Sequence, residues 1–118
     1  MTRLILLFFI LTFFMSCDSG RASEDVLPED KMIDVLTDIQ ILESFIVTMT
    51  PDSVSKNKLN FYKSVFEKHR TDSAQFRKSM DFYAKDPLNM AAMYEKVGVN
   101  IDTIQARVIL RKALKNKR

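Results

Sequence analysis

The chain has 118 residues, the length of one domain, so a second independent core is not expected. Its composition is 47% hydrophobic and 28% charged with two glycines and three prolines, which excludes a collagen-like or Pro/Gly-rich disordered chain. So few glycines argue against a sheet built on tight hairpins, and helix is favoured. One cysteine excludes an intramolecular disulfide, and one cysteine with one histidine cannot form the usual four-ligand zinc site.

Residues 1–16 have the pattern of a secretory signal peptide. Arg3 precedes the run 4–15, which is apolar except for Thr12, and the small Ser16 follows it. A helix of this run is about 18 Å long, well short of the roughly 30 Å hydrocarbon core of a bilayer. We therefore expect a cleaved export signal and no permanent membrane span.

Cys17 follows this segment directly, and the sequence Phe-Met-Ser-Cys at residues 14–17 resembles a bacterial lipobox. In a lipobox the thiol is linked to diacylglycerol, cleavage leaves the cysteine as the first residue, and its amine receives an acyl chain such as palmitate. Phe14 and Met15 depart from the usual leucine and small residue, and the alternative is an incidental free thiol. We expect lipidation at Cys17, because several acyl chains anchor a protein stably. The mature protein is then tethered to a membrane of the cell envelope and faces the periplasm or the cell surface.

Charge is unevenly distributed along the chain. Residues 18–43 carry eight acidic and two basic side chains, whereas residues 107–118 carry six basic and no acidic ones. Residues 18–27 are mostly small and polar without periodicity, so residues 17–27 are predicted to be the lipidated cysteine and a flexible spacer. A helical domain is predicted over residues 28–106 and a basic C-terminal tail over residues 107–118.

The domain is predicted to be all-α, a small bundle of about four helices. Pro28 opens the first helix, which Pro51 ends, and the second begins near Asp52 or Ser53 and runs to His69. Apolar residues recur every three or four positions in both, so each helix has a face for the core. The predicted core positions are Met32, Val35, Leu36, Ile39, Leu42, Phe45, Ile46, Leu59, Tyr62, Val65 and Phe66.

The third helix is short, and the fourth is long. Thr71 or Asp72 caps the third, and the Asp86–Pro87 pair opens the fourth, whose apolar seam continues from Met90 to Val108. A continuous helix over residues 87–114 is about 42 Å long, more than the width of a small domain, so its end must project or fold back. Gly98 lies inside the seam, and the sequence leaves open a kink or break there.

Several segments occur in a characteristic order. Residues 32–43, 62–69 and 71–76 precede a Phe-x-x-Ser-x-x-x-Tyr motif at residues 76–83, which leads into Asp86–Pro87 and residues 93–97. This order, over roughly residues 27–104, resembles the family called domain of unknown function 4296, small helical lipoproteins of Bacteroidota. The resemblance implies a lipid anchor and a helical fold, and the family supplies no catalytic residues to transfer.

No catalytic constellation is evident from the residues. His69, the only histidine, lies at a helix end, where interaction with the terminal carbonyls is expected. Ser79 has no glycine elbow around it and is expected to admit close helix packing. Asp34 and Asp38 are expected to form a solvated acidic face, not a calcium site. We predict no catalytic residue, no metal ligand and no cofactor.

Aromatic and methionine side chains are abundant between residues 61 and 93, and most are expected in the core. Any that stay exposed would form an adaptable apolar groove for a peptide or a partner helix. The candidate partner-binding residues are Tyr62, Phe66, Phe76, Met80, Tyr83, Met90 and Met93.

The leading hypothesis is therefore a non-enzymatic, lipid-anchored module of the cell envelope that contacts another envelope protein through this surface or its C-terminal helix. The alternative is an envelope hydrolase or lyase-type enzyme with an unrecognised site. A concave site with convergent polar groups would favour the enzyme, and an exposed apolar strip would favour the binding module. The basic tail is expected to meet anionic lipid headgroups or an acidic partner and not nucleic acid. The sequence leaves self-association open.

Overall fold

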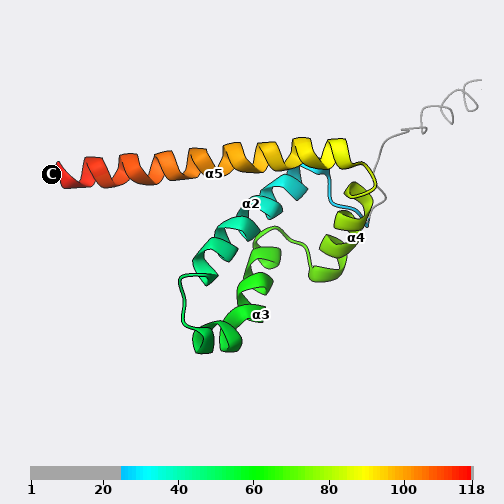
Figure 1. Cartoon of the computed structure of the whole chain (residues 1–118), viewed down its shortest axis with the longest axis horizontal. Coiled ribbons are helices and arrows are strands. Elements are labelled where there is room, and N and C mark those ends of the chain that lie inside the picture. Colours follow the sequence, from blue (N-terminus) through cyan, green and yellow to red (C-terminus); the bar gives the residue numbers. More distant parts are fainter. Residues whose placement is uncertain (1–24, 118) are drawn as a thin grey trace, which may run out of the picture.

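The computed structural model describes residues 25–117, which form four α-helices and contain no strand. These helices are α2 (Glu29–Ile46), α3 (Pro51–Lys68), α4 (Ser73–Tyr83) and α5 (Pro87–Asn116). α2 packs against both α3 and α5, and α4 lies against the first part of α5 (Figure 1). The predicted all-α fold with a long C-terminal helix is confirmed. The predicted signal peptide, Cys17 and most of the predicted spacer lie outside the described residues.

α2 is the central helix of the bundle. Because it contacts α5 on one side and α3 on another, its first three turns are buried almost all round, and Met32 and Val35 are fully buried. Met93 of α5 is also fully buried, and the rings of Phe66 and Phe76 lie 5.3 Å apart where α3 meets α4. The buried apolar side chains are Leu27, Met32, Ile33, Val35, Leu36, Ile39, Phe66, Tyr83, Met93 and Val97.

The helices begin at the residues that capping chemistry selects. The side chain of Thr50 accepts a hydrogen bond from the backbone N–H of Ser53, and Pro51 is the first residue of α3. Asp72 accepts from the N–H of Gln75 at 2.8 Å, and Asp86 accepts from the N–H of Asn89 at 3.1 Å. The predicted caps of α4 and α5 are therefore confirmed.

α5 is one continuous helix through Gly98, so the break that the sequence left open does not occur. A Cβ at Gly98 would meet nothing within 4 Å, which shows that packing does not require glycine there. The side chain of Asn100 donates to the hydroxyl of Thr37 at 3.3 Å and helps to join α5 to α2. Among residues 25–117, no helix is both long enough and apolar enough to cross a membrane.

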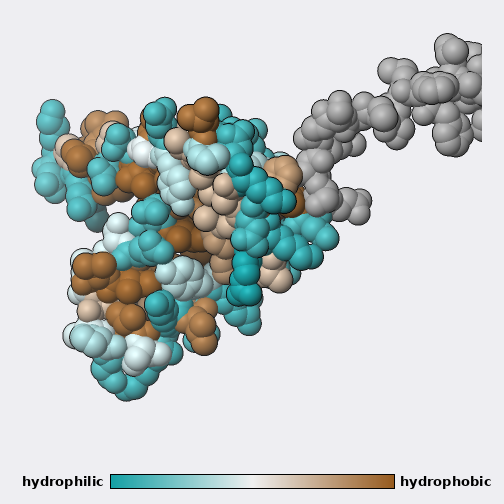
Figure 2. All heavy atoms as spheres, turned by 45° about the vertical axis from the view of Figure 1, so that its right-hand side comes forward, coloured by the Kyte–Doolittle hydropathy of each residue, from teal (hydrophilic) through white to brown (hydrophobic). Residues whose placement is uncertain are grey.

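Two predicted core positions are wrong. Leu59 is 85% exposed and Phe45 is 54% exposed. The ends of α2 and α3 that the 47–50 loop joins lie away from α5, so no third helix covers them (Figure 1). Phe45 keeps one aromatic contact, an edge-on approach to Phe61 at 6.4 Å. Apolar side chains are accordingly visible on this end of the molecule, at the lower left of Figure 2.

Leu27 belongs to the core, although the sequence placed it at the end of the spacer. It is 1% exposed, its N–H donates to the Ser79 hydroxyl at 2.8 Å, and its carbonyl accepts from the Tyr83 hydroxyl at 2.6 Å. Burial raises the pKa of Tyr83, and the nearby carboxylates of Glu29 and Asp30 raise it further. The start of the domain is therefore fastened to α4 before α2 begins.

Candidate functional site

An apolar groove lies between the second half of α2 and the middle of α5. It has a volume of about 330 Å³. Ile41 and Ile104 are each 37% exposed there, and Val108 is 45% exposed. The lining residues are Ile41 and Ser44 from α2 and Ile101, Ile104, Gln105, Val108 and Ile109 from α5.

This groove follows from the different directions of the two helices. The α5 seam packs on α2 at Met93 and Val97, and then the helices diverge while the seam continues through Ile101, Ile104 and Val108 (Figure 1). No residue from 102 to 117 is buried, so the end of the C-terminal helix projects, which is one of the two arrangements that the sequence left open. The groove is therefore a stretch of core-like helix surface that lacks its covering layer.

A polar pocket of about 400 Å³ adjoins the groove, and Ile104 lines both. One carboxylate oxygen of Asp38 lies 2.6 Å from Nε2 of His69 and 2.6 Å from Nζ of Lys68. The sequence predicted that His69 would interact with the carbonyls that end its own helix. Its side chain instead pairs with a carboxylate of α2. Asp38 is correspondingly half-buried and paired, not part of a freely solvated acidic face. Arg107 lines the same pocket from α5.

The Asp38 carboxylate is held in its charged form. Burial acts to raise its pKa, but hydrogen bonds from Lys68 and His69, together with the positive charge they bring, lower the pKa below its ordinary value. The two hydroxyls that line the pocket are engaged by their own helices: Thr37 donates to the Ile33 carbonyl and Thr103 to the Val99 carbonyl, both at 2.8 Å. Neither hydroxyl is directed to His69 as a nucleophile would be.

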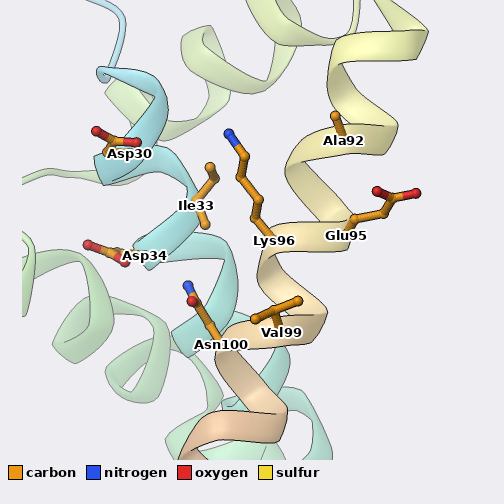
Figure 3. A pocket seen from close by; sticks show the side chains of 8 residues that line it. All are labelled: Asp30, Ile33, Asp34, Ala92, Glu95, Lys96, Val99 and Asn100. Carbon is orange, nitrogen blue, oxygen red and sulfur yellow. The ribbon is translucent and has the colours of Figure 1, made fainter.

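A third hollow, of about 570 Å³, lies between the first turns of α2 and the first half of α5. Figure 3 shows Asp30 and Asp34 on the α2 side and Glu95 and Lys96 on the α5 side. Lys96 bridges to Glu29 at 3.2 Å and so ties α5 to the start of α2. Within residues 25–117, no group of three or more acidic, histidine or cysteine side chains is placed to hold a metal ion.

The residues predicted to bind a partner lie in or against the core. Phe66, Tyr83 and Met93 are buried, and the remaining four are partly buried and packed on the core. These four are Tyr62, Phe76, Met80 and Met90. Tyr62 also donates a hydrogen bond to Glu43 at 3.2 Å, which joins α3 to α2. The aromatic and methionine set thus holds the helices together and leaves little surface for a partner.

The sequence did not indicate the α2 side of the groove. Ile41 lies outside the apolar stripe predicted for its helix, and nothing local distinguishes it from a core residue. The α5 side carried a usable signal, because the apolar seam extends beyond the length that the shorter helices can cover.

These features define a small helical module with an open apolar groove and an adjoining charged pocket. The family model described as "Domain of unknown function (DUF4296)" matches residues 24–107, and the chain belongs to that family. No curated protein and no solved structure matches the chain.

Proposed function

We propose that this protein is a non-enzymatic, lipid-anchored module of the cell envelope, a Bacteroidota lipoprotein, that receives an amphipathic helix of another envelope protein in the groove between α2 and α5. The observation that carries this proposal is the exposed apolar lining of that groove, Ile41 opposite Ile104 and Val108. An amphipathic helix fits such a lining with its i, i+3 and i+4 side chains.

Charge next to the groove favours a particular partner. Arg107 and Lys68 line the pocket that continues from Ile104, and Lys68 is 66% exposed. A helix with carboxylates beside its apolar stripe would pair at the rim with Arg107, and with Lys68 in addition to that residue's bond to Asp38, which sets register and speeds association. We therefore assign the partner helix acidic residues on one flank.

The Asp38–His69 pair is the one feature that favours the enzyme alternative. It lies in a concave site and combines a histidine with a carboxylate that has a shifted pKa. The absence of a free hydroxyl among the residues that line this pocket supports a structural role, in which the pair fastens the end of α3 to α2.

The groove is tested by site-specific cross-linking in cells. A photoreactive amino acid at Ser44, in the groove, should capture a peptide whose sequence forms an amphipathic helix with an acidic flank, and Val108→Asp should abolish the product. The same amino acid at Asn57, on the exposed face of α3, and the variant Leu59→Asp are the matched controls. Equal cross-linking from both positions, or a product that survives Val108→Asp, would contradict a groove-bound helix.

The anchor is tested separately. Cys17→Ser should prevent incorporation of labelled fatty acid and release the protein from membranes or leave an uncleaved precursor. A processed variant that still sediments with membranes after a high-salt wash would show that the anchor is not at Cys17.

A further inference from the structure

The last three turns of α5 carry a second apolar surface, on the side that turns away from α2. Leu110 and Leu114 are 60% and 58% exposed, and Ile109, at the border with the groove, is 68% exposed. In a helix, residues four apart form a row, so Ala106, Leu110 and Leu114 align, and Ala113 lies beside them. We call residues 106, 109, 110, 113 and 114 the outer face of α5.

Cations border the outer face on both sides. Arg107, Arg111 and Lys115 are spaced four apart and form a row beside Leu110 and Leu114. Lys112 lies three residues after Ile109, on the opposite border. No acidic residue follows Asp102 in the sequence. Among residues 25–117, no ion pair joins any of these four cations to a carboxylate.

The position of this segment in the fold leaves it accessible. The second half of α5 extends past α2 and α3, while Asp25, the first described residue, pairs with Lys78 of α4 near the other end of α5 (Figure 1). With thirty residues, α5 is about 45 Å long. An anchor before Asp25 would hold the start of α5 close to the membrane. If α5 then lies along the membrane surface, its far end also reaches that surface.

We propose that the outer face of α5 and its bordering cations bind the surface of an anionic phospholipid bilayer, with this part of the helix lying in the headgroup region. Helices that lie in a membrane interface combine an apolar face with lysine and arginine at its borders. The long cationic side chains reach the phosphates while their methylene stems cover apolar surface. Charge complementarity selects the anionic surface, because the segment holds only positive charge.

This inference goes beyond the proposed function and uses a mostly different surface. The groove faces α2, whereas Leu110 and Leu114 point away from it; Ile109 and Arg107 lie at the border between the two surfaces. Variants at Leu110, Leu114, Arg111 and Lys115 therefore test the outer face without changing the groove lining. A lipid anchor would add to the tail's binding by raising its effective concentration at the membrane.

The test uses the full chain on vesicles of phosphatidylglycerol or of phosphatidylcholine, with amide hydrogen exchange of residues 103–117 as the readout. The chain used is lipidated at Cys17, as proposed above, so that the anchor holds it on both kinds of vesicle and only the tail's own interaction differs between them. We expect slower exchange on phosphatidylglycerol alone, and loss of this protection at about 1 M salt, where the Debye length falls to about 3 Å.

Matched variants separate charge from apolar contact. Two cations at an anionic surface contribute about 25-fold to the equilibrium between bound and free tail, so Arg111→Gln with Lys115→Gln should lose most of the protection. Leu110→Ser with Leu114→Ser should lose it as well. The control Lys58→Gln with Lys85→Gln removes the same charge from exposed positions elsewhere and should keep it.

Three results would overturn the inference. They are equal exchange on both vesicles, protection that persists in the Arg111→Gln, Lys115→Gln variant, and protection without vesicles that grows with protein concentration. The last result would assign the outer face to a second copy of the chain.

Discussion

Ser79→Ala offers a sharp test of how the domain is closed. The Ser79 side chain is fully buried, and its hydroxyl accepts the N–H of Leu27 while it donates to the Gln75 carbonyl, both at 2.8 Å. The variant removes both hydrogen bonds. The Gln75 carbonyl keeps its backbone bond within α4, so only the N–H of Leu27 is left without a partner.

The expected cost is set by the N–H of Leu27. This residue is 1% exposed, so its N–H loses its partner among the described residues in a place that water does not reach. An orphaned buried donor costs about 1–3 kcal/mol. For a domain of this size, that corresponds to a fall in the thermal midpoint of roughly 4–8 °C per kcal/mol.

Ser64→Ala is the matched control. Ser64 makes the same kind of bond to its own helix, from its hydroxyl to the Asn60 carbonyl at 2.9 Å, but on the exposed side of α3. Thermal unfolding of both variants, followed by circular dichroism, should show a clear loss for Ser79→Ala and a change within about 0.5 kcal/mol for Ser64→Ala. Equal midpoints in the two variants would refute the claim that Ser79 fastens Leu27.

Three further outcomes are expected. Met93→Ala should lower the free energy of unfolding by about 2–5 kcal/mol in urea titrations. Leu88→Ala, at an 85% exposed position of the same helix, should be nearly neutral. Similar losses of unfolding free energy in the two variants would mean that the core is misplaced. Burial by itself would raise the pKa of Asp38, but Lys68 and His69 lower it below the ordinary value of about 3.9. The stabilisation that the charged Asp38 contributes is therefore present above this ordinary value and is lost as the pH falls through the lower pKa of the folded state. Asp38→Asn should therefore flatten the acid loss of stability in urea titrations, whereas an unchanged slope, or equal flattening in the exposed control Asp34→Asn, would contradict this role. Truncation after Ala106 should leave the thermal midpoint nearly unchanged, because none of residues 107–117 is buried, and a large fall would show that the tail supports the core.

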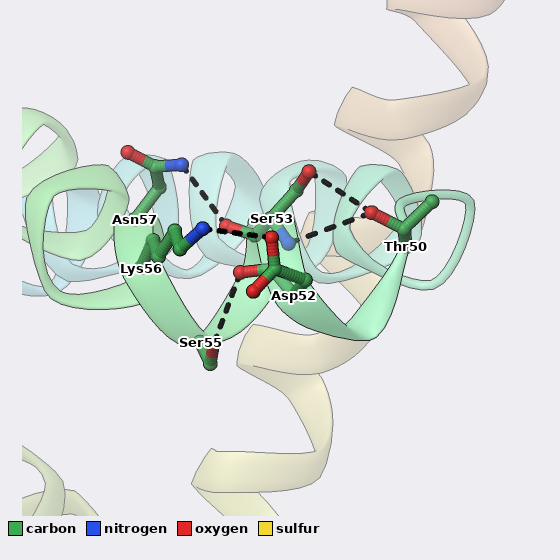
Figure 4. A network of polar contacts seen from close by, with 6 residues as sticks. All are labelled: Thr50, Asp52, Ser53, Ser55, Lys56 and Asn57. Atoms are coloured by element: carbon green, nitrogen blue, oxygen red, sulfur yellow. Dashed lines mark hydrogen bonds and ion pairs between the residues drawn. The ribbon is translucent and has the colours of Figure 1, made fainter.

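The sequence by itself placed the start of α3 one or two residues late, but it located the four helices and the caps of α4 and α5. The start of α3 shows why, since every contact in its capping network joins residues between Thr50 and Asn57 (Figure 4). Capping bonds and i, i+4 pairs involve neighbours along the chain, so they can be predicted before any packing is known. The same locality explains the correct prediction of Asp72 and Asp86 as caps.

Periodicity also identified most of the core, but it could not say how far each helix is covered. Ile39 and Phe45 belong to one predicted stripe of α2, and only Ile39 is buried. The difference arises because α5 crosses the first turns of α2 and then diverges from it. Burial of an apolar residue depends on which helix lies opposite, and the angle between two helices is not a property of either one alone.

Only the tertiary structure decided the candidate site. It brings Asp38 to His69 across 31 residues of sequence and Leu27 to Ser79 across 52. It also opens a groove that combines Ile41 with Ile104 from helices that diverge. Charge and apolar spacing did predict that the end of α5 would lack cover, because a helix of thirty residues cannot be matched along its length by partners of eighteen and eleven. Local chemistry thus fixes each helix, whereas the surfaces left open for a partner depend on how the helices cross.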